Sequence, residues 1–270
     1  MKTVSRIYMF LIFLFLYAPI IVLIVFSFNG STVGSRSVFT GFSFRWYNQL
    51  FQDGALLTAL RNTLVIAVVA ALVSTVLGTA AAIGIDGMNK WMRSAVMNVT
   101  NFPMVNPDIV TGVSLMLLFV AGTKMLGGAS LGMVSLILAH ITFCLPYVIL
   151  SVMPKLRQMD PNLSEAAQDL GCPPSSAFFR VVLPEIMPGI VTGMIMAFTL
   201  SIDDFVVSYF TSGTTQTLPI FIYSMTRKRI SPEINALSTL LFGTIIVLLL
   251  IINMRTAKDV KHAEEPAKEE

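Results

Sequence analysis

The chain has 270 residues, of which 55% are hydrophobic and only 12% are charged. Soluble domains carry roughly 25% charged residues, so a globule of this size would lack the charged groups that cover a surface in water. The formal charge of +3 is too small to indicate a nucleic acid or another polyanion as partner. Cys144 and Cys172 lie far apart and offer neither a disulfide framework nor a metal motif. The composition therefore predicts an integral membrane protein.

The first apolar stretch runs from Ile7 to Phe28, behind Lys2 and Arg6. At about 1.5 Å per residue, a helix over this stretch crosses a hydrocarbon core of roughly 30 Å. The stretch is longer than the apolar part of a secretory signal, about 7 to 15 residues, and no small-x-small cleavage site follows it. We therefore expect a retained membrane span rather than a signal peptide.

Five further apolar stretches follow, separated by segments that hold most of the charge. They cover Leu64 to Ile85, about Ala95 to Ala121, Leu131 to Met153, about Pro188 to Phe210, and Leu237 to Met254. The sequence thus predicts an all-α, polytopic membrane protein with six transmembrane helices. Because the count is even, both termini lie on one side, and the excess of Lys and Arg in the segments on that side predicts cytoplasmic termini. The run Arg227-Lys228-Arg229 opposes this orientation, because it falls outside.

Two connecting segments on the outer side have features of their own. The loop from Asn29 to Asn62 contains Trp46 and Tyr47, whose rings prefer the level of the lipid headgroups, so we expect a short interfacial helix there. Leu218 to Met225 is apolar but too short to cross the membrane, and Pro219 predicts a break. We interpret this second segment as re-entrant or capping.

The longest segment on the predicted cytoplasmic side, residues 154–188, has a residue pattern that predicts a short helix. The turn Asp160-Pro161-Asn162 leads into residues that favour a helix through Leu170. Gly171 then stops the helix, and the two prolines that follow prevent it from continuing. An isolated helix of two turns is marginal in water because nucleation is costly, so we expect it to pack against another protein.

The residues of this helix resemble a known motif. Glu165-Ala166-Ala167, Gly171 and Leu183-Pro184 stand at the spacing found in the cytoplasmic loop of permease subunits of binding-protein-dependent ABC importers. Six fixed positions, at frequencies of roughly 5 to 10% each, rarely align by chance. The resemblance implies a type I ABC importer permease fold in which residues 154–188 form the coupling loop that docks on a separate ATPase subunit. Ala166 and Ala167 would allow close approach, and Gly171 would permit the turn.

Further strings along nearly the whole chain are similar to the second permease subunit of bacterial spermidine/putrescine importers. They are Leu16 to Pro19, Arg45 to Tyr47, Pro107 to Ile109, His140 to Pro146, Phe198 to Asp204 and Ser231 to Leu237. The resemblance implies a subunit of the bacterial cell membrane that carries a polyamine inward by alternating access. It implies a homologous permease, two ATPase subunits and an extracytoplasmic binding protein as partners. Residues 1–255 would form the permease domain, and residues 256–270 a disordered cytoplasmic tail.

A polyamine carries several ammonium groups on a flexible apolar chain, so its path needs carboxylates at intervals and aromatic faces for cation–π contacts. Asp108 lies near the centre of the third apolar stretch, where an ionisable side chain costs about 3 kcal/mol. Asp203 and Asp204 fall in the outer half of the fifth stretch. Adjacent helical positions differ by about 100°, so we expect one residue of the pair Asp203-Asp204 to face the path and the other to accept hydrogen bonds from Ser201 or Ser208. The candidate pathway residues are Trp46, Asp108, Tyr147, Ser201, Asp203, Asp204 and Tyr209.

Each candidate also has a structural explanation. Pro107 suits the start of a helix, and Asp108 in the first turn would favourably meet the helix dipole. The pair Asp203-Asp204 would be at home at the outer water interface, Trp46 in a membrane belt, and the two tyrosines in ordinary packing. His140 has no acidic or cysteine neighbour at ligand spacing, which favours a packed or hydrogen-bonded histidine over a proton relay.

The chain contains no G-x-x-x-x-G-K-[ST] sequence, so we expect a transport subunit rather than an enzyme, without a cofactor of its own. ATP and Mg²⁺ would bind to the partner ATPase. One alternative keeps the transporter class and changes the cargo to another small solute. A second is an ion-coupled secondary transporter or channel that uses Asp108 and Asp203 as cation or proton sites, which leaves the cytoplasmic helix unexplained. A third, an intramembrane enzyme, lacks a paired His and acid motif or a Ser/His arrangement in the spans.

Overall fold

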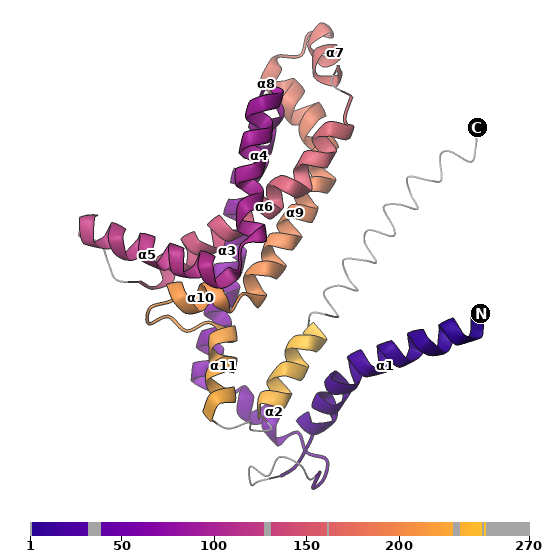
Figure 1. Ribbon diagram of the computed structural model, residues 1–270, viewed down its shortest axis with the longest axis vertical. Helices are drawn as coiled ribbons and strands as arrows, with labels where there is room; N and C mark the ends of the chain where they lie inside the picture. Colours follow the sequence, from indigo (N-terminus) through magenta and orange to yellow (C-terminus); the bar gives the residue numbers. More distant parts are fainter. Residues whose placement is uncertain are drawn as a thin grey trace. The chain divides into compact units, whose positions relative to one another are not determined.

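The computed structural model describes residues 2–31, 39–126, 131–160, 162–228, 233–244 and 246, and within these ranges nearly all of the chain is helical. The helices longer than ten residues are α1 (Lys2–Ser27), α3 (Gly54–Asp86), α4 (Lys90–Val105), α5 (Asp108–Leu126), α6 (Met133–Gln158), α9 (Leu183–Asp203) and α11 (Leu218–Lys228) (Figure 1). The shorter ones are α2 (Arg45–Leu50), α7 (Leu163–Asp169), α8 (Pro174–Ala177), the π-helical turn η1 (Phe178–Val182) and α10 (Val206–Thr211). Residues 233–244 are also helical.

The chain divides into two compact units. The first combines Met1–Leu57 with Ile222–Glu270, and the second is the continuous segment Thr58–Phe221. The second unit contains most of α3 and all of α4 to α10.

Among the described residues, five helices are long and apolar enough to cross a membrane. They are Arg6–Ser27, Gly54–Asp86, Asp108–Met125, Met133–Gln158 and Pro174–Asp203. The predicted all-helical membrane fold is confirmed. Half of the sixth predicted span, Leu237 to Met254, lies outside the described residues, so five spans are consistent with the predicted six.

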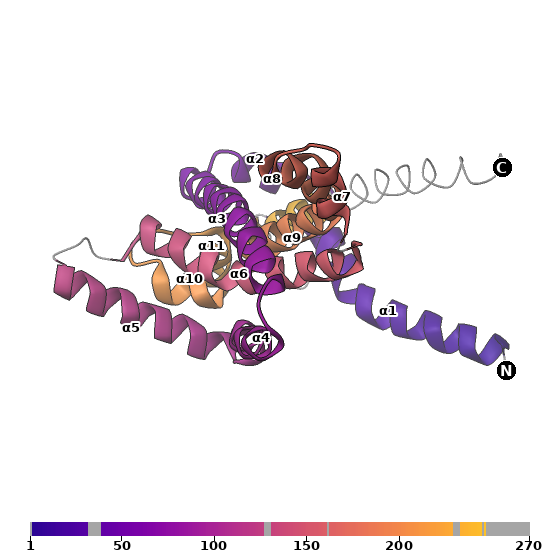
Figure 2. The same ribbon diagram turned by 90° about the horizontal axis from the view of Figure 1, so that it is seen from above.

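The predicted boundaries of the third span are wrong. The stretch from Ala95 to Ala121 is divided by Asn106-Pro107, where α4 ends and α5 begins. Pro107 restricts the residue before it to extended backbone, and Asn106 indeed has φ −72° and ψ 144°. The chain turns sharply at this point, since α4 is seen end-on where α5 runs across the view (Figure 2). Of these two helices, only α5 is long and apolar enough to cross the membrane.

The fifth span also differs from the prediction at both ends. Its helix begins at Pro174 rather than Pro188 and continues through η1 into α9. The amide of Leu183 donates to the carbonyl of Phe178, a π-type hydrogen bond one residue longer than in an α-helix. The helix ends at Asp203, not Phe210, and a separate short helix, α10, follows.

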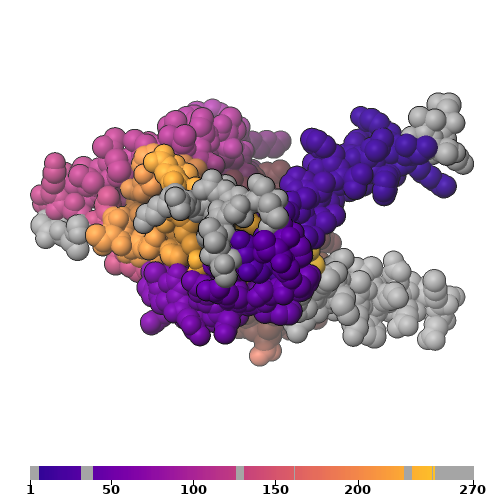
Figure 3. Space-filling view, turned by 90° about the horizontal axis from the view of Figure 1, so that it is seen from below, coloured from indigo at the N-terminus to yellow at the C-terminus, as the bar shows by residue number. Residues whose placement is uncertain are grey.

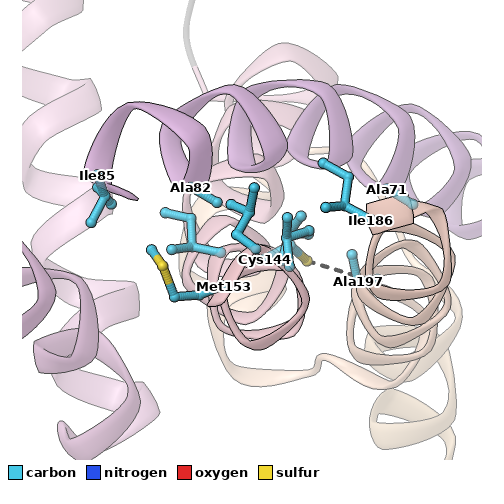
Figure 4. Packing of buried hydrophobic residues seen from close by; sticks show 11 residues of the cluster. Ala71, Ala82, Ile85, Cys144, Met153, Ile186 and Ala197 are labelled. Carbon is cyan, nitrogen blue, oxygen red and sulfur yellow. Dashed lines mark hydrogen bonds between the residues drawn. The ribbon is translucent and has the colours of Figure 1, made fainter. Parts of the chain in front are cut away.

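The core of the second unit lies where α3, α6 and α9 meet (Figure 4). Cys144 of α6 is buried there and donates through its Sγ to the carbonyl oxygen of Ala197 in α9, 3.4 Å away. Glycines permit the close approach of these helices. A Cβ on Gly193 would lie 3.2 Å from the Cα of Val148, and a Cβ on Gly78 of α3 would lie 2.7 Å from the Val148 Cβ. The small residues thus bring three long helices into contact.

In the first unit, the chain beyond α1 is tied to α2. The side-chain oxygen of Asn29 accepts hydrogen bonds from the backbone amides of Ser31 and Thr40 at 3.3 and 3.0 Å. Its backbone carbonyl accepts a hydrogen bond from the indole of Trp46 at 2.7 Å. The predicted short helix that carries Trp46 and Tyr47 is therefore confirmed as α2.

Pro219 does not break the segment from Leu218 to Met225. It stands in the first turn of α11, where no intrahelical hydrogen bond needs its missing N–H. The prediction of a break at this proline was wrong for that reason.

Candidate functional site

The two adjacent carboxylates Asp203 and Asp204 lie at the break between α9 and α10 and have different environments. Asp203 is the last residue of α9 and is exposed. Asp204 leaves the helix with φ −67° and ψ 116°, and its side chain is only 6% exposed. Its two carboxylate oxygens accept hydrogen bonds from the backbone amides of Val207 and Ser208, at 3.2 and 2.7 Å. Asp204 therefore caps the N-terminus of α10.

This geometry corrects one prediction and supports another. Asp203 and Asp204 do not occupy successive positions of one helix, because the capping role of Asp204 ends α9 at Asp203. One carboxylate is nevertheless exposed while the other accepts a hydrogen bond from Ser208, through the backbone amide rather than the hydroxyl.

His140 of α6 joins the two sides of this break. Its Nδ1 lies 2.7 Å from the hydroxyl of Ser201 in α9, and its Nε2 lies 3.0 Å from the hydroxyl of Ser208 in α10. The carboxylate of Asp204 is 3.6 Å from Nε2. His140, Ser201 and Ser208 are all buried, and hydroxyls either donate or accept, so both ring nitrogens have partners in either neutral tautomer. The predicted hydrogen-bonded histidine is confirmed.

The short helix α10 packs against α5, the helix that carries Asp108. A Cβ on Gly112, one turn after Asp108, would lie 2.9 Å from the ring of Phe210 and 3.4 Å from the carbonyl oxygen of Val206. At the far end of α10, the carbonyl oxygen of Thr211 accepts a hydrogen bond from the Ser135 hydroxyl at 2.8 Å. The surface of α10, in orange, adjoins that of α5, in magenta (Figure 3).

The remaining pathway candidates in the second unit are carried by α5, α6, α9 and α10. Asp108 is exposed in the first turn of α5. Tyr147 is half-buried against the ring of Phe143. Tyr209 of α10 is 51% exposed. Ser201, in contrast, is buried with its hydroxyl held by His140, so it does not face a path in this conformation.

Trp46 belongs to the first unit. Its indole donates to the carbonyl of Asn29, and the guanidinium carbon of Arg45 lies 6.0 Å from the centre of its ring. The residue thus helps to fix the loop after α1, in agreement with a structural role for its ring.

The predicted cytoplasmic helix is present as α7, at the end of the second unit's long helices (Figure 1). Gly171 adopts a φ of +89°, and the amide of Cys172 donates to the carbonyl of Ala167 at 3.1 Å, which closes the C-terminus of α7. None of the seven residues of α7, all of which the structure describes, is buried. The segment between the long helices covers residues 159–173 and is shorter than the predicted 154–188.

Five of the six motif residues lie on α7 and α9, and Gly171 lies in the turn after α7. Glu165 and Ala166 are exposed on α7, while Ala167 is half-buried. Leu183 and Pro184 form the first turn of α9, beside η1, which contacts α7. Next to the motif, Leu170 is 87% exposed. The arrangement presents a small apolar and acidic surface at the end of the unit.

Sequence reasoning missed the break after Asp203 and the connection through His140. Ser201, Asp204 and Ser208 are spaced by three and four residues in an otherwise apolar stretch, so on a continuous helix they would form a polar stripe. Such a stripe indicates a buried polar partner, which His140 supplies. Among the residues that the structure describes, no group of three His, Cys, Asp or Glu side chains could hold a metal ion.

The amino-acid sequence of this chain is similar to those of known transport proteins. Residues 74–260 match the family described as binding-protein-dependent transport system inner membrane component. The chain is 43% identical over 236 residues to the putrescine transport system permease protein PotI of Escherichia coli (strain K12), covering 86% of this chain and 83% of the relative. It is 38% identical over 253 residues to the spermidine/putrescine transport system permease protein PotC of Haemophilus influenzae, covering 93% and 96%.

A solved structure has the same fold. The crystal structure of a bacterial ABC transporter involved in the import of the acidic polysaccharide alginate contains a chain that matches with a TM-score of 0.72. The match covers 93% of this chain and 92% of that chain, at 17% sequence identity. At this identity the match concerns the fold alone.

Proposed function

Because this chain belongs to the family of binding-protein-dependent transport system inner membrane components, we propose that it is the permease subunit of an ATP-driven importer of spermidine and putrescine. It is a multi-pass protein of the inner membrane. The observation that carries the proposed cargo is the identity of 38 to 43% with permeases named for these two polyamines. Residues 1–255 would form one permease domain with both termini in the cytoplasm.

The exposed carboxylates supply the chemistry that this cargo requires. Asp108 and Asp203 would each receive an ammonium group, and Tyr147 and Tyr209 would offer aromatic faces to the cation. Trp46 would act at the outer entrance. Asp204 and Ser201 would serve the path indirectly, by holding the α9–α10 break next to Asp203. Affinity must remain modest in such a path, because a transport site has to release its cargo.

The energy would come from a separate pair of ATPase subunits that bind ATP and Mg²⁺. The helix α7 would dock on one of them, with Glu165 exposed to the partner and Ala166 and Ala167 permitting close approach. Closure of the ATPase pair would move α7 and, through the adjoining η1, the long helix α9. A homologous permease would complete the path, and a binding protein would deliver the cargo from the outer side.

The proposal is tested in cells that lack polyamine synthesis and their own polyamine uptake systems. Such cells receive this chain together with its ATPase, partner permease and binding protein, and the uptake of labelled putrescine and spermidine is measured. We expect uptake that disappears when any one component is omitted, and that unlabelled amino acids or sugars do not compete. Uptake of neither amine, with normal amounts of all four components in the membrane, would refute the proposed cargo.

A further inference from the structure

The break between α9 and α10 contains neither glycine nor proline, yet the chain changes direction there. The sequence at this point is Ser201-Ile202-Asp203-Asp204-Phe205-Val206. The local interaction that ends α9 is the capping of α10 by Asp204. From another helix, α6, the side chain of His140 reaches both sides of the break.

The imidazole of His140 is suited to fix the distance between the end of α9 and the start of α10. Its two nitrogens point in opposite directions along a rigid ring, one to the hydroxyl in the last turn of α9 and the other to the hydroxyl in the first turn of α10. All three side chains are at most 2% exposed, so water does not replace a lost partner easily. A buried polar group without its partner is costly, so the two helices favour the spacing that the ring imposes.

The position of α10 affects the distance between the two exposed carboxylates, Asp108 and Asp203. Asp203 ends α9 directly before the break, and Asp108 begins α5, which packs through Gly112 on α10. A shift of α10 would therefore alter the separation of Asp108 and Asp203. The binding of a diamine, whose two ammonium groups are joined by a chain of limited length, depends on that separation.

We propose that His140 is a positioning residue of the transport path, which ties α10, packed on α5, to the last turn of α9 and thereby sets the separation of Asp108 and Asp203. This inference rests on the proposed function, because it assigns a use to the two carboxylates of the polyamine path. It predicts that His140 affects the affinity for cargo without contacting the cargo.

The test compares His140→Leu and Ser208→Ala with a matched control in the assembled importer. Cys144→Ala is the control, because Cys144 lies one turn further along α6, is equally buried, and bonds only to α9. The loss of both hydrogen bonds in His140→Leu should raise the KM for putrescine uptake about tenfold, and the loss of one in Ser208→Ala about threefold. His140→Gln, which retains an amide able to bond to one hydroxyl, should be intermediate. The binding-protein-stimulated ATPase rate should stay within about twofold of the unmodified complex in every variant.

A direct distance measurement completes the test. Spin labels on the exposed positions Ile109 and Thr199 report the separation of α5 and α9. In a background of Cys144→Ala and Cys172→Ser, His140→Leu should broaden or shift the measured distance distribution, and Ser208→Ala should do so to a smaller extent. If His140→Leu does not assemble, the Ser208→Ala result decides.

The outcomes separate this inference from the proposed function. An unchanged KM and distance distribution in Ser208→Ala and in any assembled His140 variant, in a complex that imports putrescine, would overturn the positioning role alone. An equal rise of KM in Cys144→Ala would also overturn it, because the effect would then follow from general packing. Failure of the unmodified complex to import either amine would instead refute the proposed function.

Discussion

Gly189 of α9 has no room for a methyl group, because α9 lies directly on α6. A Cβ at this position would lie 2.9 Å from the carbonyl oxygen of Ser151 and 3.3 Å from the Cα of Val152. Both atoms belong to the backbone of α6, so Gly189→Ala would force the two helices apart. We estimate a cost of about 3 kcal/mol for the overpacking, offset by about 1 kcal/mol for the better helix propensity of alanine. The expected net loss of stability is about 2 kcal/mol.

Gly84 of α3 provides the matched control. A Cβ there meets no atom of the described residues within 4 Å, so Gly84→Ala should gain about 1 kcal/mol from helix propensity. The two variants should thus differ by about 3 kcal/mol. At about 2 to 4 °C per kcal/mol, their melting temperatures should differ by roughly 6 to 12 °C.

The buried thiol of Cys144 reports the melting directly, because it lies between α3, α6 and α9. Its reaction with a fluorescent maleimide is followed during heating of the purified importer, with Cys172→Ser in this chain and cysteine-free partner subunits. Exposure of Cys144 at the same temperature in Gly189→Ala and Gly84→Ala would show that a methyl group at Gly189 does not separate α9 from α6.

Three further predictions concern charged groups. Asp203→Asn should raise the KM for putrescine at least about fivefold, since an ion pair at 4 Å is worth about 1 kcal/mol even in water. Asp204→Asn should instead lower the melting temperature, because one backbone amide of α10 loses its carboxylate acceptor. The reverse pattern would contradict the assignment of Asp203 to the path and of Asp204 to the helix cap. Glu165→Lys should leave the rate of ATP hydrolysis unchanged but reduce the amount of putrescine taken up per ATP hydrolysed, measured in proteoliposomes. An unchanged ratio of uptake to hydrolysis would argue against α7 as the docking helix. Burial and the nearby charge of Asp53 raise the pKa of Glu233 above its ordinary 4.5, so the folded state holds this proton more tightly and stability falls as pH rises from about 4.5 through the raised pKa. Glu233→Gln should flatten that fall in melting curves taken across this range, and an unaltered pH dependence would exclude the effect.

The short helix α7 was predictable because its signals are local. The turn before α7 contains an Asp whose carboxylate oxygen accepts the amide of Asn162, 2.9 Å away, and the helix ends at a glycine with positive φ. Both interactions involve residues only a few positions apart, so they can be recognised in the sequence. The start of α5 was predictable for the same reason, because Pro107 suits the start of a helix and restricts the residue before it. The angle between α4 and α5 was not, because it depends on what each helix packs against.

The break after Asp203 was not predictable in the same way. The residues from Phe205 to Phe210 continue the apolar pattern, so periodicity alone extends the helix through them. What ends α9 is a buried carboxylate that caps α10, together with a histidine 61 and 68 residues away from its two serine partners. Contacts at such separations are set by tertiary packing, and one sequence contains them only as unexplained polar residues in an apolar stretch.

Inward transport of polyamines at the expense of ATP is tested by the concentration of labelled putrescine inside proteoliposomes. The proteoliposomes contain this chain, its partner permease and the ATPase, with loaded binding protein outside and ATP enclosed. We expect accumulation above the external concentration that requires ATP and the binding protein. Accumulation that persists without ATP, or ATP hydrolysis stimulated by the binding protein without entry of either polyamine, would contradict ATP-driven import of polyamines.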